Sequence, residues 1–587
     1  MTEMKKTDWS NRTLVLLITG LIVIMLIVVC STEVSAATYY VKPTGDDTKH
    51  GLSVDSAWEH VIKACTTLTA GDTVFIAAGT YNEDSWDTTS IGGVDVQVGL
   101  VSENNGSSGN EIVFKGYNAI PLIQGLNGTS GSGPYRSPAV LTGKSYIIYD
   151  SIEFRYGRRG ILMESGSHIT IRNCIVDSTI GPDNNNNGGF ITWANAFGSV
   201  TNILIEGCEF YRNGDWTPGG DPDYTAGNTS GIHIYACDTC TFDNNIVHDQ
   251  NDGIHLKGPK PGGDYDSTKS IIVSNNTIYD CGTGIWALGQ GLIEDVEVYN
   301  NTIYHLTGAG MVLHIGDDVG DELLNARFYN NTIFCNGTSY GFQSRFGNVN
   351  ACSIFNNIVY NPAYNAASGE YKAAIGFKNE SDTPENFYED YNLYFGNGDS
   401  AAGGYYVYPN ATGYTLEGWR TAYSADSGWG TNSHVSDPTF TDTSIQDYTL
   451  LAGSYAIDGG RGGDYPTYMG AYEYTGALVV TASCIDTQTT SVQIQITGAN
   501  IDSAFKKIVL LWSESTPPIT RQDSITASIT NPDTISLSEL DQATEYFYQT
   551  IATDSTDTDT SQIYNVTTAS EESTAQRRLR MRRITGQ

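Results

Sequence analysis

The sequence has few basic residues for its length. It carries 31 lysine and arginine residues against 66 aspartate and glutamate residues, which gives a formal net charge of −35 over 587 residues. A protein that binds nucleic acid needs basic side chains to neutralise phosphates, so this class of function is excluded. An acidic polymer as ligand would need a local basic site or a bridging cation, and the surplus of carboxylates favours Ca²⁺ sites.

Cysteine and proline are also scarce, and long helical patterns are missing. The chain has 10 cysteines and 17 prolines against 63 glycines and 37 tyrosines, which is typical of a turn-rich β protein. Cys237 and Cys240 are close in sequence, but no second pair or histidine follows at the spacing of a zinc site. We expect a local disulfide or buried thiols at these positions.

One long apolar run lies near the start of the chain. It extends from Thr13 to Cys30, follows three basic residues, and is followed by the small residues of Val34-Ser-Ala36. This pattern predicts a secretory signal peptide at residues 1–36, so the protein is expected to be secreted or at the cell surface, with no stable membrane span after cleavage. A retained membrane anchor is the alternative.

Seven stretches repeat one phrase, in which apolar and polar residues alternate around a central pair that is Asn-Asn in the clearest copies. Those copies are Phe242–His248, Val273–Tyr279, Val298–Tyr304, Phe328–Phe334 and Ile354–Tyr360, and the weaker ones are Ile171–Asp177 and Ile205–Tyr211. The second asparagine falls at positions 245, 276, 301, 331 and 357, so the steps are 31, 25, 30 and 26 residues. Strand periodicity in rungs of this length predicts a parallel β-helix.

The asparagine pairs have a structural explanation. Asparagine tolerates left-handed backbone at a sharp corner, and its side-chain amide can bond the same amide one rung away. We therefore interpret these residues as corners of the coil rather than as catalytic groups.

Two further segments give the chain a family resemblance. Thr38–Asp47, followed by Ala70–Tyr81, is similar to the opening of secreted right-handed parallel β-helix proteins of the pectate lyase-like superfamily. Their closing segment is similar to Asp437–Phe440 followed by Tyr448–Gly460 and Met469–Tyr474. The resemblance covers residues 37–475 and implies an all-β fold, a right-handed parallel β-helix. The superfamily hosts several chemistries, so the resemblance does not settle function.

A different alternation of apolar residues begins after Tyr474. Ser536–Asp554 resembles the late strands of a fibronectin type III sandwich, which predicts a small β-sandwich at residues 476–570. The short basic stretch at the end predicts a disordered tail at residues 571–587.

The second half of each rung predicts which side chains face outward. Each rung has a glycine followed by an apolar residue, as in Gly231-Ile-His-Ile-Tyr235 and Gly253-Ile-His-Leu-Lys257. If the residue after the glycine faces inward, the second and fourth residues after it face outward. Because parallel strands stack about 4.8 Å apart, His233 is predicted to lie beside His255, and Tyr235 beside Lys257.

Neighbouring rungs contribute further residues to the same two columns. They are Trp193, Trp286, His314, Gln343 and Arg345. Exposed aromatic faces stack on sugar rings, and polar groups fix hydroxyls or carboxylates. We expect these side chains to bind a polysaccharide, acidic in character, and the protein to act as a monomer.

Loops beside these columns are rich in aspartate. Asp221 and Asp223 precede the rung of Gly231, while Asp249 and Asp252 precede Gly253. Clustered carboxylates are the ligands that Ca²⁺ prefers, so these four residues are candidate metal ligands. Solvated loop acids in an acidic protein are the alternative.

The candidate residues suggest β-elimination on a uronate-containing polysaccharide. Lys257 is the candidate base if burial lowers its pKa, His255 or His233 is the alternative base, and Tyr235 is the candidate proton donor. Asp252-Gly-Ile-His-Leu-Lys257 is similar to the segment that carries the catalytic lysine of family-nine pectate lyases. Gly231–Tyr235 lines up with the same rung of that family, with Tyr235 at the lysine position.

Two rival functions stay open on the sequence. A glycoside hydrolase on the same fold would need two close carboxylates, for which Asp252 with Asp221 or Asp223 are candidates and Glu164 is the acid within the columns. A non-catalytic glycan-binding or adhesion protein is equally compatible with a long aromatic face and a fibronectin-like module.

Overall fold

The computed structural model describes residues 36–82, 88–91, 94–125, 135–157, 159–179, 187–192, 199–214, 229–259, 267–289, 291–315, 321–335, 340–345, 349–361, 374–377, 386–396, 405–407, 412–427 and 429–472, and beyond them the strands up to residue 567. The predicted signal peptide and basic tail lie outside these residues, apart from Ala36. The chain divides into two compact units, residues 1–435 and 436–587. In the described residues, no helix has both the length and the apolar character needed to span a membrane.

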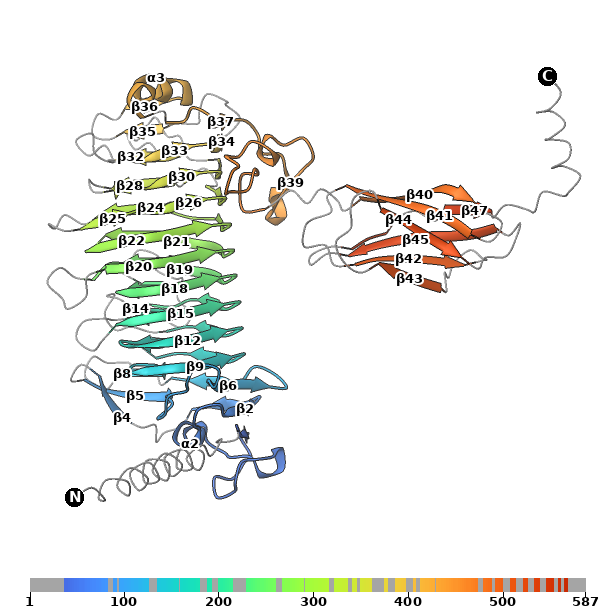
Figure 1. The fold of residues 1–587 in the computed structure, drawn as a ribbon. Helices are drawn as coiled ribbons and strands as arrows, with labels where there is room; N and C mark the ends of the chain where they lie inside the picture. Colours follow the sequence, from blue (N-terminus) through green and yellow to red (C-terminus); the bar gives the residue numbers. More distant parts are fainter. Residues whose placement is uncertain are drawn as a thin grey trace, which may run out of the picture. The chain divides into compact units, whose positions relative to one another are not determined.

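The first unit is a coil of parallel strands with three faces, and successive turns of the chain add strands to these faces (Figure 1). Face 1 is one sheet, whose strands are β1 (Thr38–Val41), β2 (Thr73–Ala77), β6 (Ile112–Tyr117), β9 (Lys144–Asp150), β12 (Gly166–Arg172), β15 (Val200–Glu206), β18 (Cys237–Asp243), β20 (Ser267–Ser274), β22 (Leu292–Tyr299), β25 (Glu322–Leu324), β26 (Arg327–Tyr329), β29 (Val349–Asn350), β30 (Ser353–Phe355) and β33 (Tyr388–Asp390).

Faces 2 and 3 are joined into a second sheet by two strands that continue through the corner between them, β19 (Ile246–Lys257) and β21 (Thr277–Gly289). Face 2 consists of β3 (Thr80–Tyr81), β7 (Leu122–Gln124), β10 (Glu153–Arg155), β13 (Ile175–Asp177), β16 (Glu209–Tyr211), the first parts of β19 and β21, β23 (Thr302–Tyr304), β27 (Thr332–Phe334), β31 (Ile358–Tyr360), β34 (Leu393–Phe395) and β37 (His434–Val435).

Face 3 carries the candidate site. It consists of β5 (Val94–Leu100), β8 (Tyr135–Val140), β11 (Ile161–Met163), β14 (Asn187–Thr192), β17 (Thr229–Tyr235), the second parts of β19 and β21, β24 (Ala309–Ile315), β28 (Tyr340–Arg345), β32 (Ile375–Phe377) and β35 (Tyr405–Val407). Two strands at its ends, β4 (Thr88–Ile91) and β36 (Thr412–Tyr414), pair antiparallel with β5 and β35.

The asparagine pairs form the corner between faces 1 and 2, and the two members of a pair differ in role. The first asparagine is left-handed, with φ of 56° at both Asn275 and Asn300. The second is buried, and its amide joins the next rung: the side-chain amide of Asn276 donates to Oδ1 of Asn301 at 2.9 Å, and that of Asn301 donates to Oδ1 of Asn331 at 2.9 Å. The predicted amide ladder is confirmed.

The glycine that begins each face-3 segment is needed for packing. A Cβ atom at Gly253 would lie 2.5 Å from the carbonyl oxygen of Gly284 and 2.6 Å from Cγ2 of Ile278, which belongs to the core. The close approach of face 3 to the side chains of face 2 therefore leaves no room for a side chain. The residues after the glycine, such as Ile232 and Ile254, then fill the core as predicted.

Helices lie near both ends of the first unit. Near the start are η1 (Val54–Ser56) and α2 (Val61–Thr67), whose Val61 and Cys65 are buried in the core. Near the end is α3 (Leu416–Ser427), which contributes the buried Trp419. Cys237 and Cys240 on β18 form a disulfide, which resolves the alternative left open by their spacing.

The second unit begins with short elements, β38 (Phe440–Asp442), η2 (Thr443–Ile445), β39 (Asp447–Leu450) and η3 (Tyr455–Ile457). Two antiparallel sheets follow, one of β40 (Val479–Thr487), β41 (Ser491–Ala499) and β44 (Asp533–Ser538), the other of β42 (Lys507–Ser513), β43 (Arg521–Ile525), β45 (Glu545–Thr553), β46 (Thr558–Thr560) and β47 (Tyr564–Thr567). The unit boundary at residue 435 precedes the expected domain end at 475, and the fibronectin type III assignment stays a prediction.

Candidate functional site

Strands β17 and β19 bring four predicted site residues together on face 3. Their parallel register pairs His233 with His255 and Tyr235 with Lys257. The intervening residues of both strands belong to the hydrophobic core, so these four side chains lie on the opposite side of the sheet. The sequence prediction of their mutual placement agrees with the structure, while their catalytic roles stay a prediction.

A lysine and a tyrosine form the polar centre of this cluster. The Nζ atom of Lys257 donates a hydrogen bond to the hydroxyl oxygen of Tyr235 at 2.9 Å. Burial lowers the pKa of Lys257 to about 8, against a smaller opposing effect of the Asp252 carboxylate. Burial also raises the pKa of Tyr235 well above its usual value. Near neutral pH, Tyr235 therefore keeps its proton, and a fraction of Lys257 is the free amine.

The two histidines are stacked and buried. Their ring centroids lie 4.6 Å apart, and both side chains are fully buried. Burial, together with the positive charges of Lys257 and Arg159, holds the pKa of His233 well below its usual range. His233 is therefore a neutral and weakly basic imidazole. On the other ring, Nδ1 of His255 lies 3.2 Å from Oδ2 of the buried Asp252.

The outward columns are less exposed than the sequence predicted. Leu162, Ile191 and Val312 are each at most 2 % exposed, like the histidines between them. The aromatic rings stack on one another: Tyr235 lies 4.9 Å from His233, and Trp286 lies 5.1 Å from His255, between ring centroids. The prediction of a freely exposed row of ring faces was wrong, because rings on the same strand and on neighbouring rungs are close enough to cover each other.

The structure describes the side chains of only some of the predicted substrate-binding residues. Trp286 on β21 and Gln343 on β28 are half-buried members of the same column as the histidines. His314 and Arg345 pair in register on β24 and β28, but their side chains lie outside the described residues. Trp193 also lies outside the described residues.

The described carboxylates do not form a calcium site on their own. Oδ2 of Asp249 lies 3.1 Å from Nδ1 of His248, and Asp252 contacts His255, so both acids face histidines. No group of three potential metal ligands was found in the part of the chain that the structure describes, and Asp221 and Asp223 lie outside that part. The calcium prediction is untested, and no step below depends on a metal.

Three further residues belong to the site and were missed or underrated from the sequence. The Thr192 hydroxyl accepts a hydrogen bond from the backbone N–H of Tyr235 at 2.7 Å and fixes that strand. Arg159 acts electrostatically on both His233 and Tyr235. Burial raises the pKa of Glu164, which lies in the column of Tyr235. The residue pattern gave no signal for Arg159, because it precedes the glycine from which the columns were counted.

Comparison with known proteins supports the fold. Residues 197–383 match the family model described as the right-handed β-helix region, which confirms the predicted right-handed parallel β-helix. No curated protein matches the chain.

Three solved structures illustrate the resemblance. The GH136 lacto-N-biosidase from Eubacterium ramulus shares 14% identity, over 68% of this chain and 68% of that chain, with a TM-score of 0.41. XylC in complex with xylose shares 10% identity, over 87% of this chain and 100% of that chain, with a TM-score of 0.38. The alginate lyase from Paenibacillus sp. shares 13% identity, over 58% of this chain and 90% of that chain, with a TM-score of 0.30. No argument is drawn from similarity at this level, and the function is argued below from the residues.

Proposed function

We propose that the protein is a polysaccharide lyase that cleaves a uronate-containing polymer by β-elimination at face 3. The observation that carries this proposal is the partly buried hydrogen bond between Lys257 and Tyr235, which holds a candidate base next to a candidate acid. We also propose that the enzyme acts as a monomer outside the cell, that its first unit is pectate lyase-like, and that its second unit contains a fibronectin type III-like module.

The reaction needs one base and one acid, and it is redox-neutral. The free amine of Lys257 removes the proton from the carbon next to the sugar carboxylate. The electron pair left behind forms a carbon–carbon double bond as the glycosidic C–O bond breaks. Tyr235 gives its proton to the leaving oxygen, so one product ends in an unsaturated uronate and the other in a free hydroxyl.

The ionisation states of the two groups support these roles. A base with a pKa of about 8 is partly deprotonated near neutral pH, and a phenol with a raised pKa remains protonated until it is needed. His233 is a weaker candidate base because its pKa is so low. Arg159 brings a positive charge to bear on Tyr235 and His233, so we propose that it binds the substrate carboxylate.

A glycoside hydrolase is the second candidate. Glu164 favours it, because it is 5 % exposed and its raised pKa suits a proton donor. Asp252, 1 % exposed, is the described carboxylate on the same face that would serve as its partner. We rank this function lower because Asp252 contacts His255, and hydrolysis has no use for the Lys257–Tyr235 pair.

Product chemistry separates the candidates, including a non-catalytic glycan-binding protein. The full chain is incubated with pectin, alginate and glycosaminoglycans, with and without a chelator, and ultraviolet absorbance and reducing ends are measured. The proposal predicts absorbing unsaturated uronates from one acidic polymer. Reducing ends without absorbance would identify the protein as a hydrolase. If neither product forms, a non-catalytic binding protein is the remaining candidate. Loss of activity with chelator would support the calcium prediction.

A further inference from the structure

Two buried threonines bond the main chain of the candidate acid and the candidate base. Oγ1 of Thr192, at the end of β14, accepts the N–H of Tyr235 at 2.7 Å and donates to the carbonyl oxygen of the same residue at 2.8 Å. Oγ1 of Thr268 on β20 donates to the carbonyl oxygen of Lys257 at 2.6 Å. Both threonines are fully buried. Each residue proposed to react is therefore tied at its own peptide to another strand.

These contacts lie at the ends of two strands. Tyr235 is the last residue of β17, and Lys257 is the last residue of β19. The register between β14 and β17 ends at Ile191 and His233, and beyond it the Thr192 hydroxyl bonds both polar groups of the Tyr235 main chain. Buried main-chain groups need hydrogen-bond partners, and here side-chain hydroxyls supply them.

Both threonines occupy positions that are apolar on a neighbouring rung. Thr192 pairs in register with Met163, and Thr268 pairs with Ile293, and both partners belong to the core. A hydroxyl in an apolar interior costs free energy unless it is hydrogen-bonded, so packing alone favours aliphatic side chains at these two positions. The bonds to the ends of β17 and β19 explain why hydroxyls are present instead.

The main chain at these two strand ends determines where the reacting groups lie. The Tyr235 ring is stacked on His233, with centroids 4.9 Å apart, so the phenol has little freedom to move independently of its strand. Nζ of Lys257 lies 2.9 Å from the phenol oxygen and 5.0 Å from the centroid of the same ring. A shift of either strand end would therefore change the distance between the amine and the phenol.

We propose that Thr192 and Thr268 are positioning residues for the elimination, which fix the ends of β17 and β19 so that the phenol of Tyr235 and the amine of Lys257 stay aligned. The inference rests on the proposed function for the roles of these two side chains. A misplacement of about 1 Å can lower a rate about 10²-fold, so two hydroxyls that contact only the main chain should control kcat.

Paired substitutions separate the hydroxyl of each threonine from its methyl group. Thr192→Val and Thr268→Val keep the shape of the side chain and lose the hydroxyl, whereas Thr192→Ser and Thr268→Ser keep the hydroxyl and lose a methyl group. On the acidic polymer that the wild type cleaves, kcat of each valine variant should fall about 10- to 100-fold with KM nearly unchanged. Each serine variant should keep kcat within about twofold of wild type, although it loses stability. A role in packing alone predicts the reverse order.

A second measurement needs no substrate, so it separates failure of this inference from failure of the proposed function. The full chain is trace-labelled with acetic anhydride, and acetylation of Lys257 relative to the half-exposed Lys115 is read by mass spectrometry of its peptides. Losing the bond to Tyr235 frees the amine, so this ratio should rise about two- to tenfold in the valine variants, the factor of one ordinary hydrogen bond. It should keep its wild-type value in the serine variants. If this pattern holds while the wild type forms no unsaturated product, the proposed function fails and the positioning of the pair stands.

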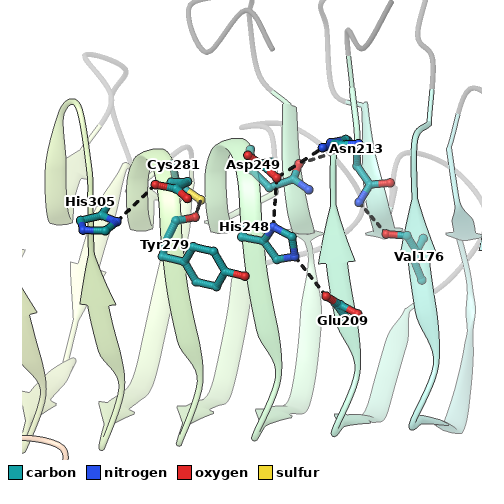
Figure 2. A network of polar contacts seen from close by, with 11 residues as sticks. Val176, Glu209, Asn213, His248, Asp249, Tyr279, Cys281 and His305 are labelled. Atoms are coloured by element: carbon teal, nitrogen blue, oxygen red, sulfur yellow. Dashed lines mark hydrogen bonds and ion pairs between the residues drawn. The ribbon is translucent and has the colours of Figure 1, made fainter. Parts of the chain in front are cut away.

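A contact of the same kind next to face 2 gives the matched control. The side-chain amide of the buried Asn213 donates to the main-chain carbonyl oxygen of Val176 at 2.9 Å (Figure 2). Asn213→Ala should lose stability and leave both kcat and the acetylation of Lys257 unchanged. Serine variants that lose as much kcat as the valine variants, or valine variants with wild-type kcat and wild-type acetylation of Lys257, would overturn the proposal.

Discussion

At the scale of single residues, the amine of Lys257 determines how activity depends on pH. Its pKa of about 8 means that the free base becomes more abundant as pH rises through that value. The rate of elimination at low substrate should therefore rise with pH to a plateau, with a midpoint near the pKa of Lys257. A rate profile measured on an acidic polymer checks this, and a rate that falls as pH rises towards 8 would contradict the role of the amine as base.

The hydroxyl of Tyr235 can be removed without removing its ring. Tyr235→Phe keeps the stack on His233 but cannot donate a proton, so kcat should fall by about 10²- to 10⁴-fold. The kcat of Lys257→Met should fall by at least the same factor. Lys269→Met is the matched control, because Lys269 is a half-exposed lysine of face 1 and should be neutral in the same assay. Wild-type kcat in Tyr235→Phe would remove the proton donor from the mechanism.

Glu389, a buried acid near the end of the coil, should affect the stability of the fold and not the activity. Oε1 of Glu389 accepts hydrogen bonds from Asn392, Tyr394 and Ser433, yet burial raises the pKa of Glu389 to about 7. The unfolded chain releases this proton near pH 4.5, so the folded state loses stability as pH rises from there to about 7.

Glu389→Gln should remove this penalty. Above pH 7 the variant should gain about 3 kcal/mol in free energy of unfolding, with little change in acid, as measured by denaturant titration at several pH values. Glu417→Gln is the control, because that side chain is 82% exposed and its loss should change stability by less than about 0.5 kcal/mol. Equal stability of wild type and Glu389→Gln at alkaline pH would show that Glu389 is ionised without cost.

At the scale of elements, the amide ladder separates two adjacent asparagines by role. Asn301→Ala removes the oxygen that accepts the backbone N–H of Asn276 and the amide that donates to Val273, all buried. Each unsatisfied group costs about 1–3 kcal/mol, so the variant should lose about 3 kcal/mol or more in free energy of unfolding. Asn300→Gly, which keeps the left-handed corner, should lose only a few tenths of a kcal/mol in free energy of unfolding. Equal losses in the two variants would contradict this division.

The glycine column of face 3 links the packing of the coil to its site. In Gly253→Ala the added methyl group would meet the backbone of Gly284 and the side chain of Ile278, so strand β19 must shift. We expect a loss of about 1–3 kcal/mol in stability, together with reduced kcat, because Asp252 and His255 flank this position. Thermal unfolding and the elimination assay measure both, and unchanged values would show that the strand yields locally.

The sequence predicted the elements of the coil well because each rung repeats the same physical constraints. Left-handed corners, buried amides and alternating core residues recur at residues such as Asn275 and Asn276, so a periodic pattern reveals them. Exposure was not predictable in the same way. His233 and His255 alternate with core residues as outward residues should, but burial depends on what covers the face, which alternation along one strand does not encode.

Contacts between rungs were predictable only where the register was. Tyr235 and Lys257 share a position after their glycines, so their pairing followed from the pattern. The Thr192 hydroxyl and the charge of Arg159 lie on earlier rungs, before or outside the counted positions, and their effect depends on side-chain direction.

At the scale of the whole molecule, the net charge of −35 opposes the approach of an acidic polymer. Salt screens this repulsion, with a Debye length of about 8 Å at physiological ionic strength. The value of kcat/KM on an acidic polysaccharide should therefore increase when salt is added to a low-salt buffer, and kcat should change little. A steady decrease of kcat/KM with salt would show that local positive charge at the site dominates binding instead.

The central claim is that face 3 performs an elimination with Lys257 and Tyr235 as its base and acid. The most direct test is mass analysis of the fragments released from an acidic polysaccharide by the wild type, Lys257→Met and Lys269→Met. We predict fragments that are one water lighter than hydrolysis products from the wild type and Lys269→Met, and none from Lys257→Met. Fragments of full hydrolytic mass from the wild type, or unsaturated fragments undiminished in Lys257→Met, would contradict the account.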